Sequence, residues 1–219
     1  MNEPDHVPAS RRSPLYREFA NAELRRIAGH SQPWTSPGST GETALYDFCL
    51  MPRFGVRGAG AANFLRERQL VAPEAVNTAV PNNKQRWVAR LGKTEYWVLA
   101  PTAGEDYPAD MNGVTAPANS CYPVPCDEGR AWFVLHHPQK AAVMAKLCGV
   151  DLREAAFPTG SIAQTSVARV NAVIIHHEVF GKPVFSLLSD VSSAHYLWGA
   201  LEDALAEFGA GAGALGEIV

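Results

Sequence analysis

The chain has 219 residues, of which 47% are hydrophobic and 19% are charged, and its net charge is −3. This is the composition of a globular protein. It lacks the Lys/Arg block that nucleic-acid binding requires and the apolar run of about 18 residues that a membrane span requires. The polar, proline-rich start (MNEPDHVPASRRSPLYREF) has no apolar region of the secretory type, so a cytoplasmic location with reduced cysteines is expected.

Residues 1–43 are expected to form an N-terminal arm and loop with little core of their own. The first 14 residues are polar and contain three prolines, and residues 30–41 are rich in Ser, Thr, Pro and Gly, which is typical of a loop. A short helix over residues 15–28, ended by Gly29, is predicted from the spacing of Leu15, Phe19, Ala22 and Leu24. Such a lead either lies against another surface or forms a mobile terminus.

Residues 44–100 are predicted to form a first α+β subdomain. Strands over residues 45–50 and 53–57 are separated by Pro52, which has no N–H for a central ladder. A glycine-rich bend leads into a helix whose apolar face is formed by Ala61, Phe64 and Leu65.

A loop over residues 71–84 then leads to a hairpin over 86–99, with its bend at 92–94. Residues 101–129 contain five prolines and are predicted to be a long irregular loop, which marks a boundary or an interface.

Residues 130–209 repeat this plan as a second α+β subdomain. The pattern predicts a strand over 131–136, a helix over 139–148, two strands around a turn at 181–183, and a final helix over 192–208. The first of the two strands has one face formed by Ala168, Val170, Ala172 and Ile174. The final helix has a stripe formed by Leu197, Leu201, Leu205 and Phe208.

The ends of the final helix are marked by their residue types. Ser192 or Ser193 is expected to cap its start, and Gly209 suits the position just after its end. Residues 210–219 (AGAGALGEIV) are rich in small residues and are expected to form a flexible tail.

Three phrases, together with this order of elements, resemble a known family: LYDFCLMPRFGVRGAGAANFL, the hairpin WVARLGKTEYWVL, and QTSVARVNAVII with SSAHYLWGALEDA. They resemble the gamma subunit of heterotetrameric sarcosine oxidase, which is related to the folate-binding aminomethyltransferase of the glycine cleavage system. The resemblance covers roughly residues 44–208. It implies an α+β fold of two small related subdomains with antiparallel sheets and packed helices.

The resemblance also implies a structural, non-catalytic chain with alpha, beta and delta partner subunits. These are a large subunit with its own aminomethyltransferase-like half, a flavin-bearing subunit and a small zinc-binding subunit. Such complexes oxidise N-methyl amines such as sarcosine and pass the one-carbon unit to tetrahydrofolate. FAD, FMN, NAD, tetrahydrofolate and zinc would be held by the partners and none by this chain. A close relative, N-methylglutamate dehydrogenase, is built from similar subunits.

One stretch departs from the pattern of the folate-using aminomethyltransferases. Those enzymes carry Gly-Gly followed by paired Asp ahead of the hairpin, and one of these acids orients the folate and the amine. Here residues 81–86 read Pro-Asn-Asn-Lys-Gln-Arg, and the chain is too short for the third domain of those enzymes. Both differences argue against independent folate chemistry. A stand-alone folate-dependent transferase and a small-molecule binding module are the competing hypotheses.

A glycine-rich loop invites a nucleotide-binding interpretation. Gly58-Ala59-Gly60-Ala61-Ala62-Asn63 follows a strand and opens a helix, as a dinucleotide loop does. However, Asn63 replaces the last glycine, and a hairpin follows in place of a parallel strand. Tight packing between strand and helix is therefore the favoured role of the two glycines.

Histidines and cysteines invite a metal interpretation: His136, His137, His176, His177, Cys121 and Cys126. Adjacent residues of a strand point to opposite faces, so each His pair offers only one ligand to a shared site. A zinc site needs four ligands at workable spacing. We therefore expect surface or interface histidines, unremarkable thiols and no metal site.

Cys49 and Cys148 fall in apolar elements and are expected to pack as small hydrophobic residues rather than act as nucleophiles. Asp47 is either a functional acid or, as favoured, a residue that ends a strand ladder. The solvated face of the last helix is expected to carry Glu202, Asp203 and Glu207. No residue is assigned a catalytic, cofactor-binding or metal-binding role.

The five tryptophans are candidate interface anchors, because Trp is favoured at interfaces: Trp34, Trp87, Trp97, Trp132 and Trp198. Trp34, in the proline-rich lead, is the preferred docking residue, with local packing as the alternative. Trp198 is expected at the edge of the core.

Overall fold

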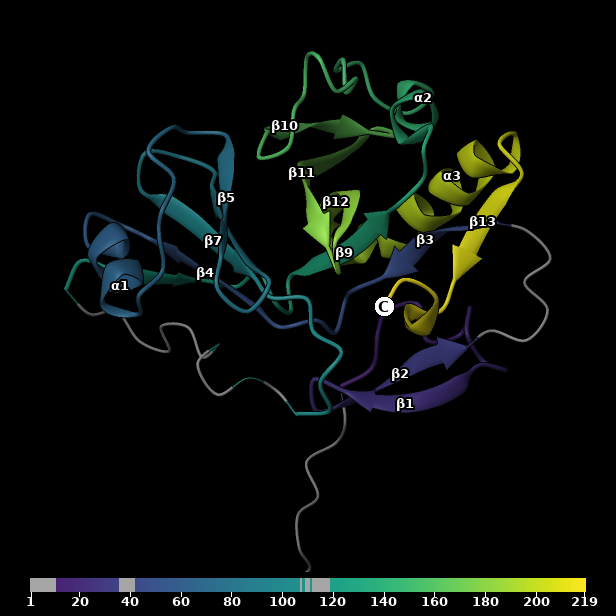
Figure 1. Cartoon of the computed structure of the whole chain (residues 1–219), viewed down its shortest axis with the longest axis horizontal. Coiled ribbons are helices and arrows are strands. Elements are labelled where there is room, and N and C mark those ends of the chain that lie inside the picture. Colours follow the sequence, from purple (N-terminus) through teal and green to yellow (C-terminus); the bar gives the residue numbers. More distant parts are fainter. Residues whose placement is uncertain (1–10, 36–41, 107, 109–110, 112–118) are drawn as a thin grey trace, which may run out of the picture.

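The computed structural model describes residues 11–35, 42–106, 108, 111 and 119–219. Two antiparallel sheets face each other across a shared core, and helices cover their outer faces (Figure 1). A separate hairpin near the N-terminus lies beside them. The predicted α+β class with antiparallel sheets is confirmed, whereas the division into subdomains 44–100 and 130–209 stays a prediction.

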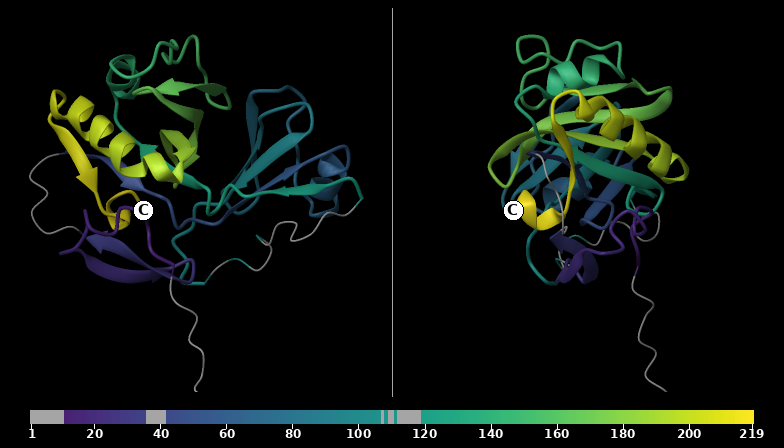
Figure 2. Two further views of the ribbon diagram at one scale, coloured as in Figure 1. Left: turned by 180° about the vertical axis from the view of Figure 1, so that it is seen from behind. Right: turned by 90° about the vertical axis from the view of Figure 1, so that its right-hand side faces the viewer.

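The larger sheet has six strands in the order β10-β11-β12-β9-β3-β13. Their bounds are β3 Glu42–Asp47, β9 Arg130–Leu135, β10 Ile162–Val167, β11 Val170–Val179, β12 Lys182–Asp190 and β13 Ala210–Gly213. All neighbours are antiparallel except β13, which pairs with β3 in parallel. Two helices lie on the outer face of this sheet, α2 (Lys140–Ala145) and α3 (Ala194–Ala206), and a 3-10 turn at Val191–Ser193 precedes α3 (Figures 1 and 2).

The smaller sheet has five antiparallel strands in the order β5-β6-β7-β4-β8. Their bounds are β4 Arg53–Arg57, β5 Thr78–Asn82, β6 Arg86–Arg90, β7 Glu95–Leu99 and β8 Tyr122–Val124. The short helix α1 (Ala61–Glu67) covers its outer face. The separate hairpin consists of β1 (Glu23–Ile27) and β2 (His30–Thr35).

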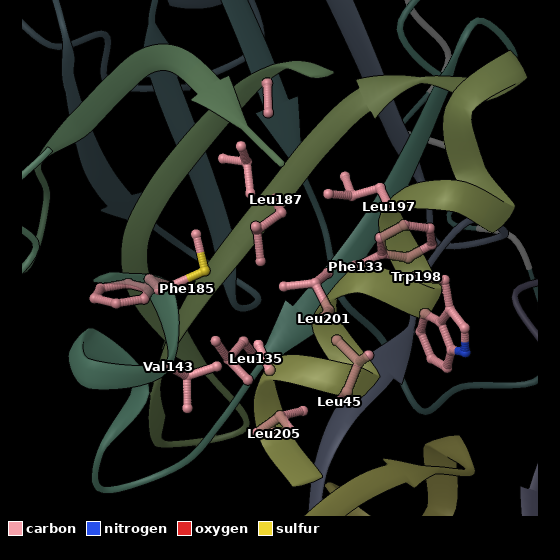
Figure 3. Packing of buried hydrophobic residues seen from close by; sticks show 14 of the residues in the cluster. Leu45, Phe133, Leu135, Val143, Phe185, Leu187, Leu197, Trp198, Leu201 and Leu205 are labelled. Carbon is pink, nitrogen blue, oxygen red and sulfur yellow. The ribbon is translucent and has the colours of Figure 1, made fainter. Parts of the chain in front are cut away.

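Strand β9 shows why the central segments are continuously apolar. Its run Ala-Trp-Phe-Val-Leu is fully buried because both faces of the strand are covered. Phe133 and Leu135 pack under α3 and α2, as Figure 3 shows, whereas Trp132 and Val134 point into the core between the sheets. The larger sheet thus packs against a separate hydrophobic core on each of its two faces.

Several sequence predictions are confirmed. The strand at 53–57, the helix that starts at Ala61, the hairpin over 86–99 and the final helix with its leucine stripe are all present. Gly209 follows α3 with a φ of +69°. Ser193 occupies the N-cap position of α3, as expected, but its side chain makes no capping hydrogen bond. The carboxylate of Asp190 accepts the N–H of Ser192 at 3.0 Å and caps the 3-10 turn before α3.

The N-terminal predictions are wrong in part. The expected helix over 15–28 is a series of turns followed by β1, and the expected loop after Gly29 contains β2. Leu15 and Phe19, which are four residues apart, are both buried in the core, but they reach it from a turn-rich segment rather than from a helix. Leu24 is 60% exposed on the hairpin. The predicted arm over residues 1–10 and the loop over 36–41 lie outside the described residues.

Four further strands were not expected. Strand β8 (Tyr122–Val124) lies within the predicted long loop 101–129 and pairs with β4. Strand β5 lies in the predicted loop 71–84, and β10 precedes a tight turn at Ala168-Arg169, so Ala168 does not share a strand face with Ala172. The prediction of a flexible tail over residues 210–219 is also wrong. Residues 210–213 form β13, a 3-10 turn covers Leu215–Glu217, and Ile218 is fully buried between the sheets. Among the described residues, no helix is long and apolar enough to cross a membrane.

Candidate functional site

Arg53, the first residue of β4, is a buried arginine at the junction of the two sheets. Its side chain is 1% exposed. The guanidinium donates to carbonyl oxygens at 2.6–3.4 Å, which belong to Phe48, Cys49, Met51, Cys126, Asp127 and Arg130. These carbonyls lie on the two chain crossings between the sheets. Arg53 therefore ties the crossings together, and its donors are used up by backbone rather than by a ligand.

Asp47 is the last residue of β3 and lies beside this junction. One carboxylate oxygen accepts the N–H of Cys49 at 2.8 Å, and the other accepts the hydroxyl of Ser13. Burial raises the pKa of Asp47 above its ordinary value, although these hydrogen bonds act in the opposite direction. The favoured role at the end of a strand ladder is confirmed. Its partner Ser13, 34 positions away, carried no sequence signal.

A second polar group is enclosed between the sheets. Trp132 Nε1 donates to the Ser186 hydroxyl at 2.8 Å, and the same hydroxyl lies 2.6 Å from His177 Nε2. The Trp87 ring meets His177 edge-on from the smaller sheet, with 5.3 Å between centroids. Burial, with His176 next in importance, lowers the pKa of His177 to about 3. His177 is therefore neutral near pH 7, and its Nδ1 is buried with no partner among the described residues.

The histidine pairs do not form a metal centre. His176 faces the outer core, where it stacks on Phe157 and its Nδ1 lies 2.8 Å from the Phe157 carbonyl, whereas His177 faces the inner core. The prediction of opposite faces is confirmed. His137 is also buried, so the expectation of surface histidines fails for three of the four. Within the described ranges, no group of three or more His, Cys, Asp or Glu side chains is placed to hold a metal ion.

The cysteines behave as small apolar side chains. All four are free and buried. Burial raises the pKa of the Cys49 thiol well above its ordinary value and that of Cys126 to about 12, and it raises the pKa of Cys121. Thiols of this kind are not nucleophiles near neutral pH. Cys148 is 8% exposed and packs in the outer core, as predicted.

The glycine-rich loop packs against another loop rather than presenting its N–H groups to an anion. Gly60 N donates to the Ser120 carbonyl at 3.0 Å. A Cβ on Gly58 or Gly60 would lie 2.1 Å or 2.0 Å from a carbonyl oxygen of residues 119–120. The packing interpretation is therefore supported, although the close neighbour is this second loop. Asn63 accepts from Arg66 on the surface of α1.

The tryptophans are mostly internal. Trp87, Trp97, Trp132 and Trp198 are 0–6% exposed, so they are not available as surface anchors, and Trp198 lies within the core. Trp34 packs locally: its ring lies under the Arg25 guanidinium and against Gly216, where an added Cβ would come within 2.8 Å of the ring. The docking role preferred for Trp34 thus gives way to its alternative, packing of the hairpin against the C-terminal turn.

The acids of α3 are only partly a solvated face. Asp203 and Glu207 are exposed, and Glu207 forms an ion pair with Lys146 at 2.8 Å. Glu202 is half-buried, and its burial raises its pKa.

A cleft of about 340 Å³ opens where the rim of the smaller sheet meets β10 and β11. Trp97 Nε1 donates to Glu95 at 3.1 Å, and the Arg130 guanidinium lies 5.9 Å from the Trp97 ring centre. Gln164 spans the cleft by donating to the Leu91 carbonyl at 2.7 Å. The lining offers one carboxylate and one guanidinium together with the polar side chains of Gln164, Thr165 and Asn171, so it supports polar binding.

The stretch that departs from the aminomethyltransferase pattern forms the turn between β5 and β6. Asn82 pairs with Arg86 across the ladder, and the two residues at the bend, Lys84 and Gln85, both have a φ of +59°. This conformation normally selects Gly or Asn. The turn therefore carries a cationic and an amide side chain, Lys84 and Gln85, and no acid, as the sequence comparison of residues 81–86 indicated.

No protein-family model and no curated protein sequence matches the chain. Solved structures do match it. A chain of heterotetrameric sarcosine oxidase from Corynebacterium sp. U-96, in complex with pyrrole 2-carboxylate, aligns with a TM-score of 0.66 and 21% identity. The match covers 91% of this chain and 96% of that chain.

Aminomethyltransferase T of the glycine cleavage system from Bartonella henselae aligns with a TM-score of 0.63 and 18% identity. The match covers 93% of this chain but 59% of the aminomethyltransferase, so this chain spans about three fifths of its length. The two alignments show that this protein has the aminomethyltransferase-like fold.

Proposed function

We propose that this chain is a non-catalytic, gamma-type subunit of a multi-subunit flavin-dependent sarcosine oxidase. Such a complex demethylates sarcosine to glycine and passes the one-carbon unit to tetrahydrofolate. The observation that carries the proposal is the correspondence in length: the match covers 96% of the sarcosine oxidase chain but 59% of the stand-alone aminomethyltransferase. A chain that corresponds in full to one component of a heterotetramer is best understood as such a component.

The chemistry of the described residues supports a structural role. The buried thiols are protonated, His177 is neutral and enclosed, and the guanidinium of Arg53 is saturated by carbonyls. The β5–β6 turn carries Lys84-Gln85 rather than the glycines and acids of folate-using enzymes. We therefore propose that FAD, FMN, NAD, tetrahydrofolate and zinc are bound by alpha, beta and delta partners in a cytoplasmic complex.

Purification of the tagged chain from its source tests this proposal. We expect it to elute in a large complex that shows flavin absorbance and reduces an electron acceptor when sarcosine is added. A soluble, flavin-free monomer without large partners would contradict the proposal. A tightly bound folate on the isolated chain would instead support a stand-alone folate-dependent transferase.

The same preparation separates the nearest alternative, the corresponding subunit of an N-methylglutamate dehydrogenase. Sarcosine and N-methylglutamate are compared as substrates, with oxygen and an artificial dye as acceptors. Activity with N-methylglutamate alone and dependence on the dye would favour the dehydrogenase.

A further inference from the structure

A pocket of about 430 Å³ lies outside the two sheets, between the turns of residues 11–22 and the β1–β2 hairpin. Its lining is mainly apolar with a cationic rim and includes Arg12, Tyr16, Arg17, Phe19, Leu24 and Leu50. The volume is in the range that holds a large side chain or a short peptide segment. None of these residues belongs to the cleft beside Trp97, so the pocket is a separate surface of the chain.

The floor of the pocket is held rigidly on the body of the protein. Ser13 donates to the buried Asp47, and Leu15 beside it is fully buried. Phe19 meets Trp198 of α3 edge-on, with ring centroids 5.9 Å apart. Because these contacts order the segment before anything binds, docking there would cost little conformational entropy.

The exposed part of the pocket combines apolar and cationic groups. Tyr16 is 44% exposed and Leu24 is 60% exposed, which is high for large hydrophobic side chains. The guanidinium groups of Arg12 and Arg17 lie 5.6 Å and 5.4 Å from the Tyr16 ring centre, and Arg17 Nε donates to the Tyr16 hydroxyl at 2.9 Å. Tyr16 is thus held between two cations at the mouth of the pocket.

The charge of this region contrasts with that of the chain. Residues 11–26 contain five arginines and two glutamates, whereas the chain as a whole carries a charge of −3. Glu18 faces His195 at 3.4 Å. No ion pair within the described part of the chain joins Arg12 or Arg17 to a carboxylate. These cations, which have no carboxylate partner among the described residues, attract an anionic partner, while the apolar lining favours an apolar side chain.

We propose that this N-terminal pocket is the docking site for an acidic segment of a partner subunit. An apolar or aromatic side chain of that segment enters between Phe19 and Leu24, and its Asp or Glu residues pair with Arg12 and Arg17. This docking rests on the proposed function, because it requires an assembly in which the partner is present.

Charge reversal within the assembled complex provides the test. The chain is co-expressed with its partner subunits, and the Arg12→Glu/Arg17→Glu variant is compared with wild type. A matched control, Arg66→Glu/Lys93→Glu, makes the same charge change on exposed residues of α1 and the β6–β7 bend. We expect the pocket variant to weaken subunit association by about tenfold or more, and the control to leave it unchanged.

The outcomes separate this docking site from the proposed function. A wild-type chain that assembles with no partner overturns both. A complex that forms equally well with the pocket variant overturns the docking site alone. Circular dichroism of each variant checks that its fold is intact, and the loss of association in wild type with rising salt is expected as well.

Photo-crosslinking then identifies the occupant. The Tyr16→p-benzoylphenylalanine variant, irradiated within the complex, is expected to crosslink to a partner peptide that contains Asp or Glu beside an apolar residue. Replacing that acid by Lys in the partner should restore association with the Arg12→Glu/Arg17→Glu variant. Crosslinks only to residues 1–10 of the same chain, or only to a second copy of the chain, would overturn the proposal.

Discussion

At the scale of single residues, His177 couples the stability of the protein to pH. Burial lowers its pKa from the ordinary value of 6.5 to about 3 in the folded chain. At pH values between these two pKa values, His177 is protonated in the unfolded chain but stays neutral in the folded chain. The contribution of His177 to stability is therefore complete above about pH 6.5 and is lost as the pH falls toward 3.

We predict that His177→Gln reduces this acid sensitivity. The free energy of unfolding of wild type should fall by up to about 1.4 kcal/mol per pH unit more than that of the variant over this interval. Urea unfolding at a series of pH values from 7.5 to about 4 measures the difference, with His136→Gln, at a partly exposed residue, as the control. Parallel pH profiles for wild type and His177→Gln would contradict the prediction. The raised pKa of Asp47 acts in both proteins and cancels.

At the scale of elements, glycines with different surroundings should respond oppositely to the same substitution. Gly60→Ala would place a Cβ 2.0 Å from the Asn119 carbonyl oxygen, so we predict a loss of about 1–3 kcal/mol as the loops separate. Gly199 is exposed in the middle of α3 with no atom within 4 Å of an added Cβ. Gly199→Ala should therefore gain about 0.5–1 kcal/mol through helix propensity.

Chemical unfolding of the two alanine variants beside wild type checks this pair. A Gly60→Ala protein that is as stable as wild type would show that the loop at residues 119–120 moves aside without cost. In that case the glycine-rich loop would need a role other than packing.

The elements that the sequence predicts well are those with both a clear period and a glycine or proline boundary. Strand β4 follows Pro52, and Gly209 lies just beyond the end of α3. Two of the missed strands, β5 and β10, adjoin turns without such a marker: Lys84-Gln85 and Ala168-Arg169 have φ of +48° to +67° without a glycine. Strand β13, Ala-Gly-Ala-Gly, has no strand propensity of its own and exists because it pairs with β3.

The polar groups of the candidate site depend on contacts that spacing alone does not define. The adjacent positions of His176 and His177 were enough to predict opposite faces, since strand residues alternate. The contact of His177 with Ser186 and Trp132 joins three strands and depends on their register. Likewise, Ser13 meets Asp47 only because the N-terminal segment folds back onto the end of β3.

At the scale of the whole molecule, the two sheets are expected to unfold together. Their shared core draws Trp87, Trp97 and Leu99 from one sheet and Trp132, Val134 and Leu188 from the other. Arg53 also binds carbonyls on both crossings between the sheets. We therefore predict a single calorimetric transition in which the van't Hoff and calorimetric enthalpies agree.

Two resolved transitions would contradict this prediction and would indicate that each sheet is an independent folding unit. Intrinsic fluorescence of the tryptophans and far-UV circular dichroism should give the same midpoint, because Trp87 and Trp132 report on the shared core.

The position of β3 in the larger sheet has a consequence for synthesis in the cell. Tyr46 of β3 pairs with Val134 of β9 and with Gly213 of β13, so its ladder partners follow it late in the chain. At about 5–20 residues per second, the ribosome needs roughly 5–20 s to make the first of these partners. During that interval β3 lacks the neighbouring strands that later pair with it. The nascent chain is therefore expected to bind chaperones that shield exposed strands.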